Sequence, residues 1–129
     1  MSLPSVIRPF VLVVEDEPVL RMLAADIVDE CGFEPIEAAH AEDAVEILAA
    51  RDDIRLVFTD IDMPGGMDGL RLAAAIRDRW PPIEVIVTSG KPLPAGFMLP
   101  ARVIFIPKPF DLARLAEALR GLGNSPIAT

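Results

Sequence analysis

Short apolar runs that end in polar residues constrain the fold of this chain more than any other feature of its sequence. The clearest runs cover residues 10–14, 56–58, 83–87 and 103–106. Strands are typically this short, and nearly continuous apolar character indicates strands that are covered on both faces. Parallel sheets with helices packed on either side meet that condition.

Segments with helical periodicity separate these runs. In the first segment, Pro18 suits an initial helical position behind Asp16 or Glu17, and Gly32 suits the end of the helix. Its apolar residues recur at helical spacing: Leu20, Leu23, Ala24, Ile27 and Cys31. Further helices are expected over residues 41–51, 70–80 and 111–123. Strands that alternate with helices predict a parallel sheet with right-handed crossovers.

The segment Glu34–Ala38 differs from the other strands because polar and apolar residues alternate in it and Pro35 interrupts it. A proline cannot donate to a strand ladder, so this strand belongs at an edge of the sheet. With the second strand outermost, the order 2-1-3-4-5 follows, and the strands that lead to Asp16 and Asp60 become neighbours. We therefore predict the α/β class, a doubly wound, five-stranded parallel sheet of flavodoxin-like order.

The stretch between the fourth and fifth predicted strands is hostile to helix formation. Glycines and prolines interrupt it at Gly90, Pro92, Pro94, Gly96 and Pro100. A proline inside a helix costs about 3 kcal/mol and a glycine about 1 kcal/mol. The longest run without proline, residues 95–99, is too short for two helical turns. We expect the fourth helix to be missing or reduced to a turn, with Phe97, Met98 and Leu99 covering the sheet in its place.

The bulk properties indicate one globular domain. The chain has 129 residues, of which 52% are hydrophobic, and we place the domain at residues 10–123 between tails at 1–9 and 124–129. Residues 1–3 are compatible with a cloning remnant. No apolar run approaches the roughly 20 residues of a membrane span. The single cysteine, Cys31, fits a reducing compartment such as the cytoplasm, and the net charge of −8 disfavours direct binding to DNA or RNA.

Polar residues end four of the predicted strands, and these ends meet at one edge of a parallel sheet. They are Glu15 and Asp16 after the first strand, Asp60 on the third, Thr88 on the fourth and Lys108 after the fifth. Strand ends are often polar only because they meet water, which explains each residue alone better than the whole set. Crowded carboxylates repel one another, and a divalent cation relieves that repulsion. Oxygen ligands with room for water suit Mg²⁺ together with a phosphoryl group.

Four motifs carry a resemblance to a known family. They are residues 13–18 (Val-Val-Glu-Asp-Glu-Pro), residues 60–64 with Asp68 and Gly69, residues 88–90 (Thr-Ser-Gly), and residues 107–110 (Pro-Lys-Pro-Phe). Each motif is weak alone, but their order and spacing together are highly specific. The chain resembles, along nearly its whole length, the receiver domain of two-component response regulators. No output domain follows the last helix in this sequence, which favours the stand-alone, single-domain type.

The resemblance implies that Asp60 accepts a phosphoryl group from a phosphohistidine on a sensor histidine kinase or a phosphotransfer protein. Thr88 and Lys108 would contact the phosphoryl oxygens. Thr88, drawn inward, and Phe105, turning into the vacated space, would form a switch; the alternative for Phe105 is a static core residue. The chain would catalyse only its own phosphorylation and dephosphorylation, so we do not expect an enzyme that turns over a substrate.

The resemblance also implies a magnesium site. Asp16 would bind Mg²⁺ directly and Glu15 would bind it through water. Asp60 and the backbone carbonyl of Asp62 would complete the protein ligands, so the Asp62 side chain need not be one.

The surfaces for partners follow from the same resemblance. The exposed side of the first helix, from Pro18 onward, and the loop with Phe110 would dock on the kinase, and a cis peptide between Lys108 and Pro109 would aim the lysine. An unknown downstream protein would receive the signal. The family commonly dimerises through its fourth helix, fifth strand and fifth helix, so a chain without a regular fourth helix is expected to be a monomer or a weak dimer.

Two alternatives remain open at this stage. A binding module with the receiver fold would work without phosphorylation, although every functional position is filled here. A haloacid-dehalogenase-type phosphatase would share Asp60, Asp62, Thr88 and Lys108, but it needs further acids after the lysine and leaves Glu15 unexplained. Steady hydrolysis of small phosphate esters would favour the phosphatase.

Overall fold

A computed structural model describes residues 8–62, 68–93, 95–96, 98–108 and 112–123, and the statements below concern these residues. Strands and helices alternate as far as β4. The elements are β1 (Phe10–Val14), α1 (Pro18–Glu30), β2 (Glu34–Ala38), α2 (Ala41–Ala50), β3 (Ile54–Asp60), α3 (Gly69–Arg79), β4 (Glu84–Ser89), β5 (Val103–Pro107) and α4 (Leu112–Gly123). None of the described helices is long and apolar enough to cross a membrane.

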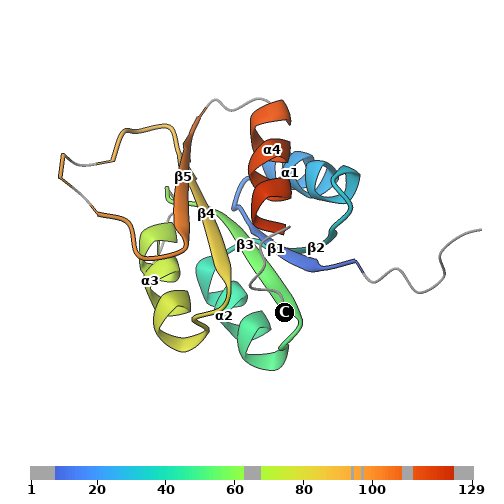
Figure 1. Ribbon diagram of the computed structural model, residues 1–129, viewed down its shortest axis with the longest axis horizontal. Helices are drawn as coiled ribbons and strands as arrows, with labels where there is room; N and C mark the ends of the chain where they lie inside the picture. Colours follow the sequence, from blue (N-terminus) through green and yellow to red (C-terminus); the bar gives the residue numbers. More distant parts are fainter. Residues whose placement is uncertain (1–7, 63–67, 94, 97, 109–111, 124–129) are drawn as a thin grey trace, which may run out of the picture.

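The five strands form one parallel sheet in the order β2-β1-β3-β4-β5, so the predicted fold class and strand order are confirmed (Figure 1). Pro35 lies on the edge strand β2, as its missing backbone donor requires. In the register of the central strands, Asp60 on β3 lies beside Thr88 on β4. The fold therefore brings the ends of strands that are far apart in the sequence to one edge.

Helices cover both faces of the sheet, α1 and α4 on one side and α2 and α3 on the other (Figure 1). Side chains alternate between the faces along each strand, which explains why the central strands are apolar throughout. On β1, Val11 and Val13 pack in the core beneath α1 and α4, whereas Leu12 and Val14 pack in the core beneath α2 and α3. All four side chains are fully buried.

Local sequence signals determine where α1 begins and ends. The Glu17 side chain caps the helix by accepting hydrogen bonds from the backbone N–H groups of Val19 (2.8 Å) and Leu20 (3.2 Å). Pro18 occupies the first helical position, where its missing N–H costs nothing. After the helix, Gly32 has a φ of +94°, a conformation that residues with a Cβ rarely adopt.

The buried stripe of α1 differs from the one expected. Its buried residues are Ala24, Ala25, Ile27 and Val28, whereas Leu20 and Leu23 are 43% and 49% exposed. Val19 and Met22 are also exposed, so the first two turns of the helix present an apolar outer surface. The small alanines allow close packing on the sheet, and the larger residues of the first turns lie on the outer side of the helix.

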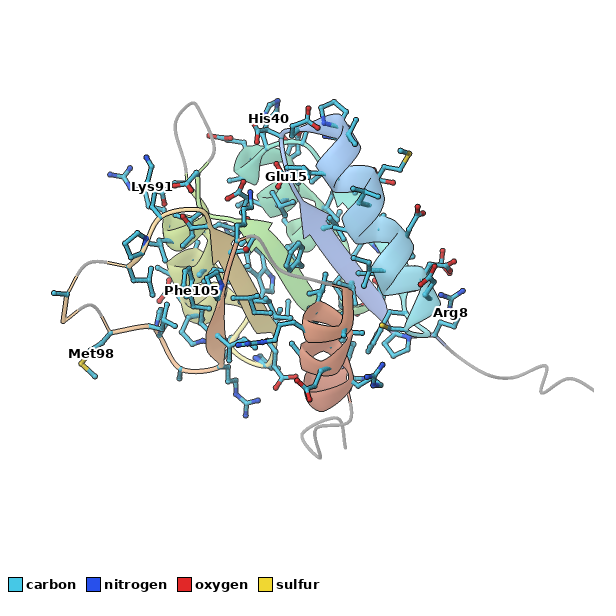
Figure 2. The ribbon with its side chains drawn as sticks, turned by 90° about the horizontal axis from the view of Figure 1, so that it is seen from above. Arg8, Glu15, His40, Lys91, Met98 and Phe105 are labelled. Carbon is cyan, nitrogen blue, oxygen red and sulfur yellow. The ribbon has the colours of Figure 1, made fainter. Side chains whose placement is uncertain are left out.

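No helix occurs among the described residues between β4 and β5. This confirms the expectation that the helix that would follow the fourth strand is missing or reduced to a turn; the helix labelled α4 is the one that follows β5. Leu99 packs against the core beneath α2 and α3 and covers the sheet as expected. Met98 does not, because it is 86% exposed and points away from the sheet (Figure 2). The chain turns at Gly96, which has a φ of +77°, and the expectation for Phe97 lies outside the described residues.

Candidate functional site

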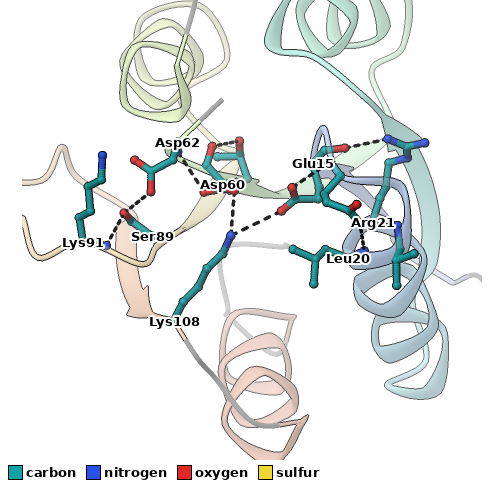
Figure 3. Close-up of polar contacts among 11 residues, drawn as sticks. Glu15, Leu20, Arg21, Asp60, Asp62, Ser89, Lys91 and Lys108 are labelled. Atoms are coloured by element: carbon teal, nitrogen blue, oxygen red, sulfur yellow. Dashed lines mark hydrogen bonds and ion pairs between the residues drawn. The ribbon is translucent and has the colours of Figure 1, made fainter. Parts of the chain in front are cut away.

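The carboxyl ends of three strands of the sheet, β1, β3 and β5, bring together residues singled out in the sequence (Figure 3). Glu15 and Asp16 follow β1, Asp60 is the last residue of β3, and Lys108 follows β5. The Lys108 Nζ atom donates a hydrogen bond to Asp60 Oδ2 at 2.8 Å and lies 3.8 Å from Glu15 Oε1. These side chains therefore share one small region at the carboxyl edge of the sheet.

Asp60 is only 3% exposed, and both oxygens of its buried carboxylate accept a hydrogen bond. One carboxylate oxygen, Oδ1, accepts a hydrogen bond from the backbone N–H of Asp62 at 3.0 Å, and the other faces Lys108. The ammonium group compensates for the burial of the carboxylate and fixes its orientation.

The acidic residues form a cluster that fits a divalent cation. Glu15, Asp16 and Asp60 each offer one carboxylate oxygen, and these three oxygens all lie within 4.8 Å of one another. Burial raises the pKa of Glu15 to about 7, and the nearby charge of Asp60 adds to that increase. Hard oxygen ligands in this arrangement suit Mg²⁺, which would also relieve the repulsion between the carboxylates.

Lys108 stays charged in this environment. Burial by itself lowers the pKa of Lys108, but the hydrogen bond to Asp60 and the negative charges of Asp60, Glu15 and Asp62 outweigh that effect and raise it. The site therefore contains a stable positive charge directly beside the Asp60 carboxylate.

The Thr88 hydroxyl is buried on the strand next to Asp60 and has no hydrogen-bond partner among the described residues. The residue is only 1% exposed, and its Oγ1 atom forms no hydrogen bond within the part of the chain that the structure describes. A buried hydroxyl without a partner is unfavourable, so this group is poised to accept or donate a hydrogen bond to something that enters the site.

Ser89 holds the Asp62 side chain away from the acidic cluster. Its Oγ donates to Asp62 Oδ2 at 2.6 Å and accepts a hydrogen bond from the Lys91 backbone N–H at 3.0 Å (Figure 3). Sequence reasoning missed this contact, because nothing in the spacing of the residues shows a link between β4 and the chain after β3. Ser89 therefore provides a partner for the Asp62 carboxylate, and the expectation that this side chain need not be a metal ligand remains a prediction.

Arg21 is a residue of the site that sequence reasoning missed. Its guanidinium donates to the backbone carbonyl of Glu15 at 2.8 Å and to Glu37 Oε1 on β2 at 3.3 Å. Arg21 thus ties α1 and β2 to the turn that carries the acidic pair. The sequence offers one signal for this role, which is that Arg21 lies one turn into the helix that begins shortly after Glu15 and Asp16.

Gly69 allows α3 to begin directly against Asp60. A Cβ at this position would lie 2.3 Å from the Asp60 carbonyl oxygen, which no side chain tolerates. The Gly69 backbone N–H donates to the carbonyl of Ile61 at 3.2 Å, and Asp68 caps the helix by accepting from the Arg71 N–H at 2.9 Å. The predicted Asp68–Gly69 motif therefore has a clear structural reason.

The remaining predicted residues lie around this centre or outside the described chain. Phe105 on β5 is half-buried, packs against the core beneath α2 and α3, and lies beside Val87 of β4. Pro18 is exposed at the start of α1. Phe110 and the Lys108–Pro109 peptide bond include residues outside the described ranges, so both expectations remain predictions.

The fold and the site together define a doubly wound α/β protein with a carboxylate-rich, lysine-containing edge. The sequence model of one family, described as response regulator receiver domain, matches residues 11–120. The chain belongs to this family.

The chain is similar to several characterised proteins. Sensor kinase CckA of Brucella abortus (strain 2308) is 35% identical over an alignment of 118 residues that covers 85% of this chain and 12% of CckA. The crystal structure of response regulator protein TrrA from Thermotoga maritima in complex with Mg²⁺-BeF is 27% identical, with a TM-score of 0.79 and coverage of 90% and 99% of the two chains.

The crystal structure of histidine kinase ThkA in complex with TrrA contains a chain that is 28% identical, with a TM-score of 0.77 and coverage of 90% and 98%. The chain spans between 12% and 25% of the length of the curated relatives compared with it. The similarity therefore concerns the receiver domain and not the whole of those relatives.

Proposed function

We propose that this chain is a phosphoacceptor in two-component signalling, phosphorylated on Asp60 by a histidine kinase or a phosphotransfer protein in a Mg²⁺-dependent reaction. Family membership supports the class of reaction, and the surroundings of Asp60 support the choice of residue. In this proposal the chain works in the cytoplasm, signals through contact with a downstream protein, and turns over no other substrate.

The observation that carries the proposal is the pair of donors around Asp60. Lys108 Nζ lies 2.8 Å from one carboxylate oxygen, and the buried Thr88 hydroxyl on the next strand has no partner among the described residues. A phosphoryl group on Asp60 gives both donors an oxygen acceptor and brings negative charge to the lysine. Without such a group, the cost of burying the Thr88 hydroxyl stays uncompensated.

The transfer itself needs positioning and charge neutralisation more than covalent assistance. A carboxylate oxygen of Asp60 attacks phosphorus, and the phosphorus–nitrogen bond to the donor histidine breaks with its electron pair staying on the imidazole. Lys108 and Thr88 stabilise the charge on the equatorial oxygens. Water later cleaves the acyl phosphate and returns Asp60 to its carboxylate form.

The acidic cluster supplies the metal ligands in this proposal. Asp16 would hold Mg²⁺ directly and Glu15 would hold it through water, with Asp60 and the backbone carbonyl of Asp62 as further ligands. When bound, Mg²⁺ neutralises the charge that develops on the phosphoryl oxygens. TrrA was crystallised with Mg²⁺-BeF, and this similarity supports the same metal here.

A switch accompanies phosphorylation in this proposal. Thr88 is drawn towards the phosphoryl group, and Phe105, half-buried on the neighbouring strand β5 and one register position from Thr88, turns into the space that Thr88 leaves. The complex of ThkA with TrrA supports a histidine kinase as the kind of partner from which the signal comes.

The experiment that tests the acceptor is labelling with acetyl phosphate and Mg²⁺, followed on a Phos-tag gel. We expect the wild-type chain to be labelled and Asp60→Asn to lose the label entirely. Asp62→Asn is the matched control, because its side chain is bound to Ser89 and the variant keeps the acceptor. A label on Asp60→Asn at the wild-type level would contradict the assignment.

The same assay separates the two alternatives. If the wild-type chain takes no label from acetyl phosphate or from a kinase, the binding module without phosphorylation is the better explanation. If the wild-type chain releases phosphate from small esters over many turnovers, a haloacid-dehalogenase-type phosphatase is the better explanation.

A further inference from the structure

A cavity lies at the end of the sheet opposite Asp60. It has a volume of about 420 Å³ and opens between the end of α2, the start of β3 and the connection from α3 to β4. Because β3 is seven residues long, the cavity and Asp60 are about 20 Å apart. The volume falls in the range of about 300–1,000 Å³ that is typical of small-molecule sites.

The lining combines apolar surfaces with positive charge. The flat or apolar side chains are those of Ile54, Trp80, Pro81, Pro82 and Ile83. Arg51, Arg55 and Arg79 line the same cavity, and Asp52 is the single carboxylate among its lining residues in the described chain. Positive charge is therefore concentrated here although the chain as a whole carries a net charge of −8.

The three arginines are not equivalent. The Arg51 guanidinium forms a two-pronged ion pair with Asp53, at 2.8 and 2.9 Å, and lies over the Phe10 ring. The Arg79 guanidinium instead lies over the Trp80 ring, 4.5 Å from its centroid. Neither Arg79 nor Arg55 forms an ion pair with a carboxylate in the part of the chain that the structure describes.

Such groups favour one kind of ligand. A guanidinium presents a planar fork of donors that matches phosphate, and one that is held on an aromatic ring loses less conformational freedom on binding. The adjacent Trp80, Pro81 and Pro82 side chains offer flat apolar surfaces on which a planar ring can pack. Both features lie within a single cavity.

We propose that this cavity binds a nucleoside phosphate, with the phosphate on Arg55 and Arg79 and the base against Trp80 and the neighbouring prolines. The site is separate from Asp60 and does not depend on the function proposed above. It gives the domain a second input, a small anionic ligand at the end of the sheet that carries no phosphoacceptor.

Trp80 itself provides the measurement, because it is the only tryptophan and the chain has no tyrosine. AMP, GMP, adenosine and inorganic phosphate are titrated into the full chain, with fluorescence excited at the red edge and the indole N–H resonance followed by NMR. We expect saturable binding of AMP or GMP, and binding at least tenfold weaker for adenosine and for inorganic phosphate.

Variants locate the site. Arg55→Gln and Arg79→Gln should each weaken nucleotide binding at least tenfold, whereas Asp52→Asn should strengthen it because a negative charge is removed from the cavity lining. Arg71→Gln is the matched control, since Arg71 is an exposed arginine of α3 outside the cavity lining. We expect each variant to fold, because Arg55 and Arg79 are exposed, and thermal melting checks this.

Three results would overturn the proposal. The first is no saturable change at Trp80 with either nucleotide into the millimolar range. The second is unchanged binding by Arg55→Gln and Arg79→Gln. The third is equal affinity for inorganic phosphate and AMP, which would show an anion contact without recognition of the base. Asp60→Asn should leave nucleotide binding intact, whatever it does to phosphorylation.

Discussion

Glu15 and Asp16 are adjacent in the sequence, yet their surroundings differ. The Glu15 carboxylate is buried, accepts the Glu17 backbone N–H at 3.1 Å and faces Lys108. Asp16 is only half-buried. Each residue contributes one oxygen to the acidic cluster, but Glu15 already has protein partners for its charge.

The proposed metal roles predict unequal effects of two neutral variants. Asp16→Asn should weaken Mg²⁺ binding at least tenfold, because a direct ligand is lost, whereas Glu15→Gln should weaken it less, because a water bridge remains. Isothermal titration of the unphosphorylated protein measures both. Asp62→Asn, whose carboxylate faces Ser89, serves as the control. Equal losses for the two acids would contradict the division of roles.

At the scale of elements, the sequence predicted most of what the structure shows, and the misses have physical causes. The apolar runs and Pro35 were enough to predict the sheet order, because burial and a missing donor act locally. The exposed side of α1 was missed because periodicity shows that Leu20 and Leu23 share a helix, not that the sheet leaves them uncovered. Met98 was expected to cover the sheet because it is apolar, but apolar character does not show to which side a loop residue points.

In the site, too, some features were predicted from the sequence and others were missed. Asp60, Thr88 and Lys108 were predicted to converge because strand ends meet at one edge, and they do. Arg21 and the contact of Ser89 with Asp62 were not predicted, because they depend on side-chain reach between elements that no spacing reveals.

Replacing a glycine by alanine should have opposite effects on stability at Gly69, where α3 touches the end of β3, and at Gly121, which has open space around it. Gly69→Ala should lower the free energy of unfolding by about 1–3 kcal/mol, because its Cβ would lie 2.3 Å from a backbone oxygen. Gly121→Ala in α4, where nothing lies within 4 Å, should raise it by up to about 1 kcal/mol. Urea denaturation measures both. A neutral Gly69→Ala would show that α3 can shift away from Asp60 at little cost.

The apolar surface of α1 is the described candidate for the kinase contact. Its exposed residues Val19, Leu20, Met22 and Leu23 lie on the helix that follows the acidic pair. Leu20→Gln combined with Leu23→Gln should slow transfer from a cognate kinase at least tenfold, because contacts of this kind depend on a few apolar anchors. Labelling by acetyl phosphate should not change.

Ala74→Gln on the exposed side of α3 is the control for this test. An equal loss in both assays would indicate that the α1 variants disturb the site and not the docking. Phe110→Ala is expected to behave like the α1 variants if its loop shares the contact.

For the whole molecule, the absence of a helix among the described residues between β4 and β5 predicts the oligomeric state. The segment between β4 and β5 contains no helix in its described residues and exposes Met98, so the surface through which the family commonly dimerises has a different shape. We expect the chain to remain a monomer, or to dimerise weakly through another surface, with Mg²⁺ and beryllofluoride. Light scattering measures this. A beryllofluoride-dependent dimer that Met98→Gln and changes in α4 disrupt would contradict it.

Arg21 joins three parts of the molecule through one side chain: the helix proposed to meet the partner, the edge strand, and the carbonyl of Glu15. A partner that moves this arginine changes the free energy of the metal site, and thermodynamic linkage makes the effect mutual. Whatever factor the bound metal applies to the affinity for the partner, the partner applies the same factor to the affinity for the metal. A kinase that docks on α1 would then distinguish the metal-loaded form of the domain from the metal-free form without contacting the metal.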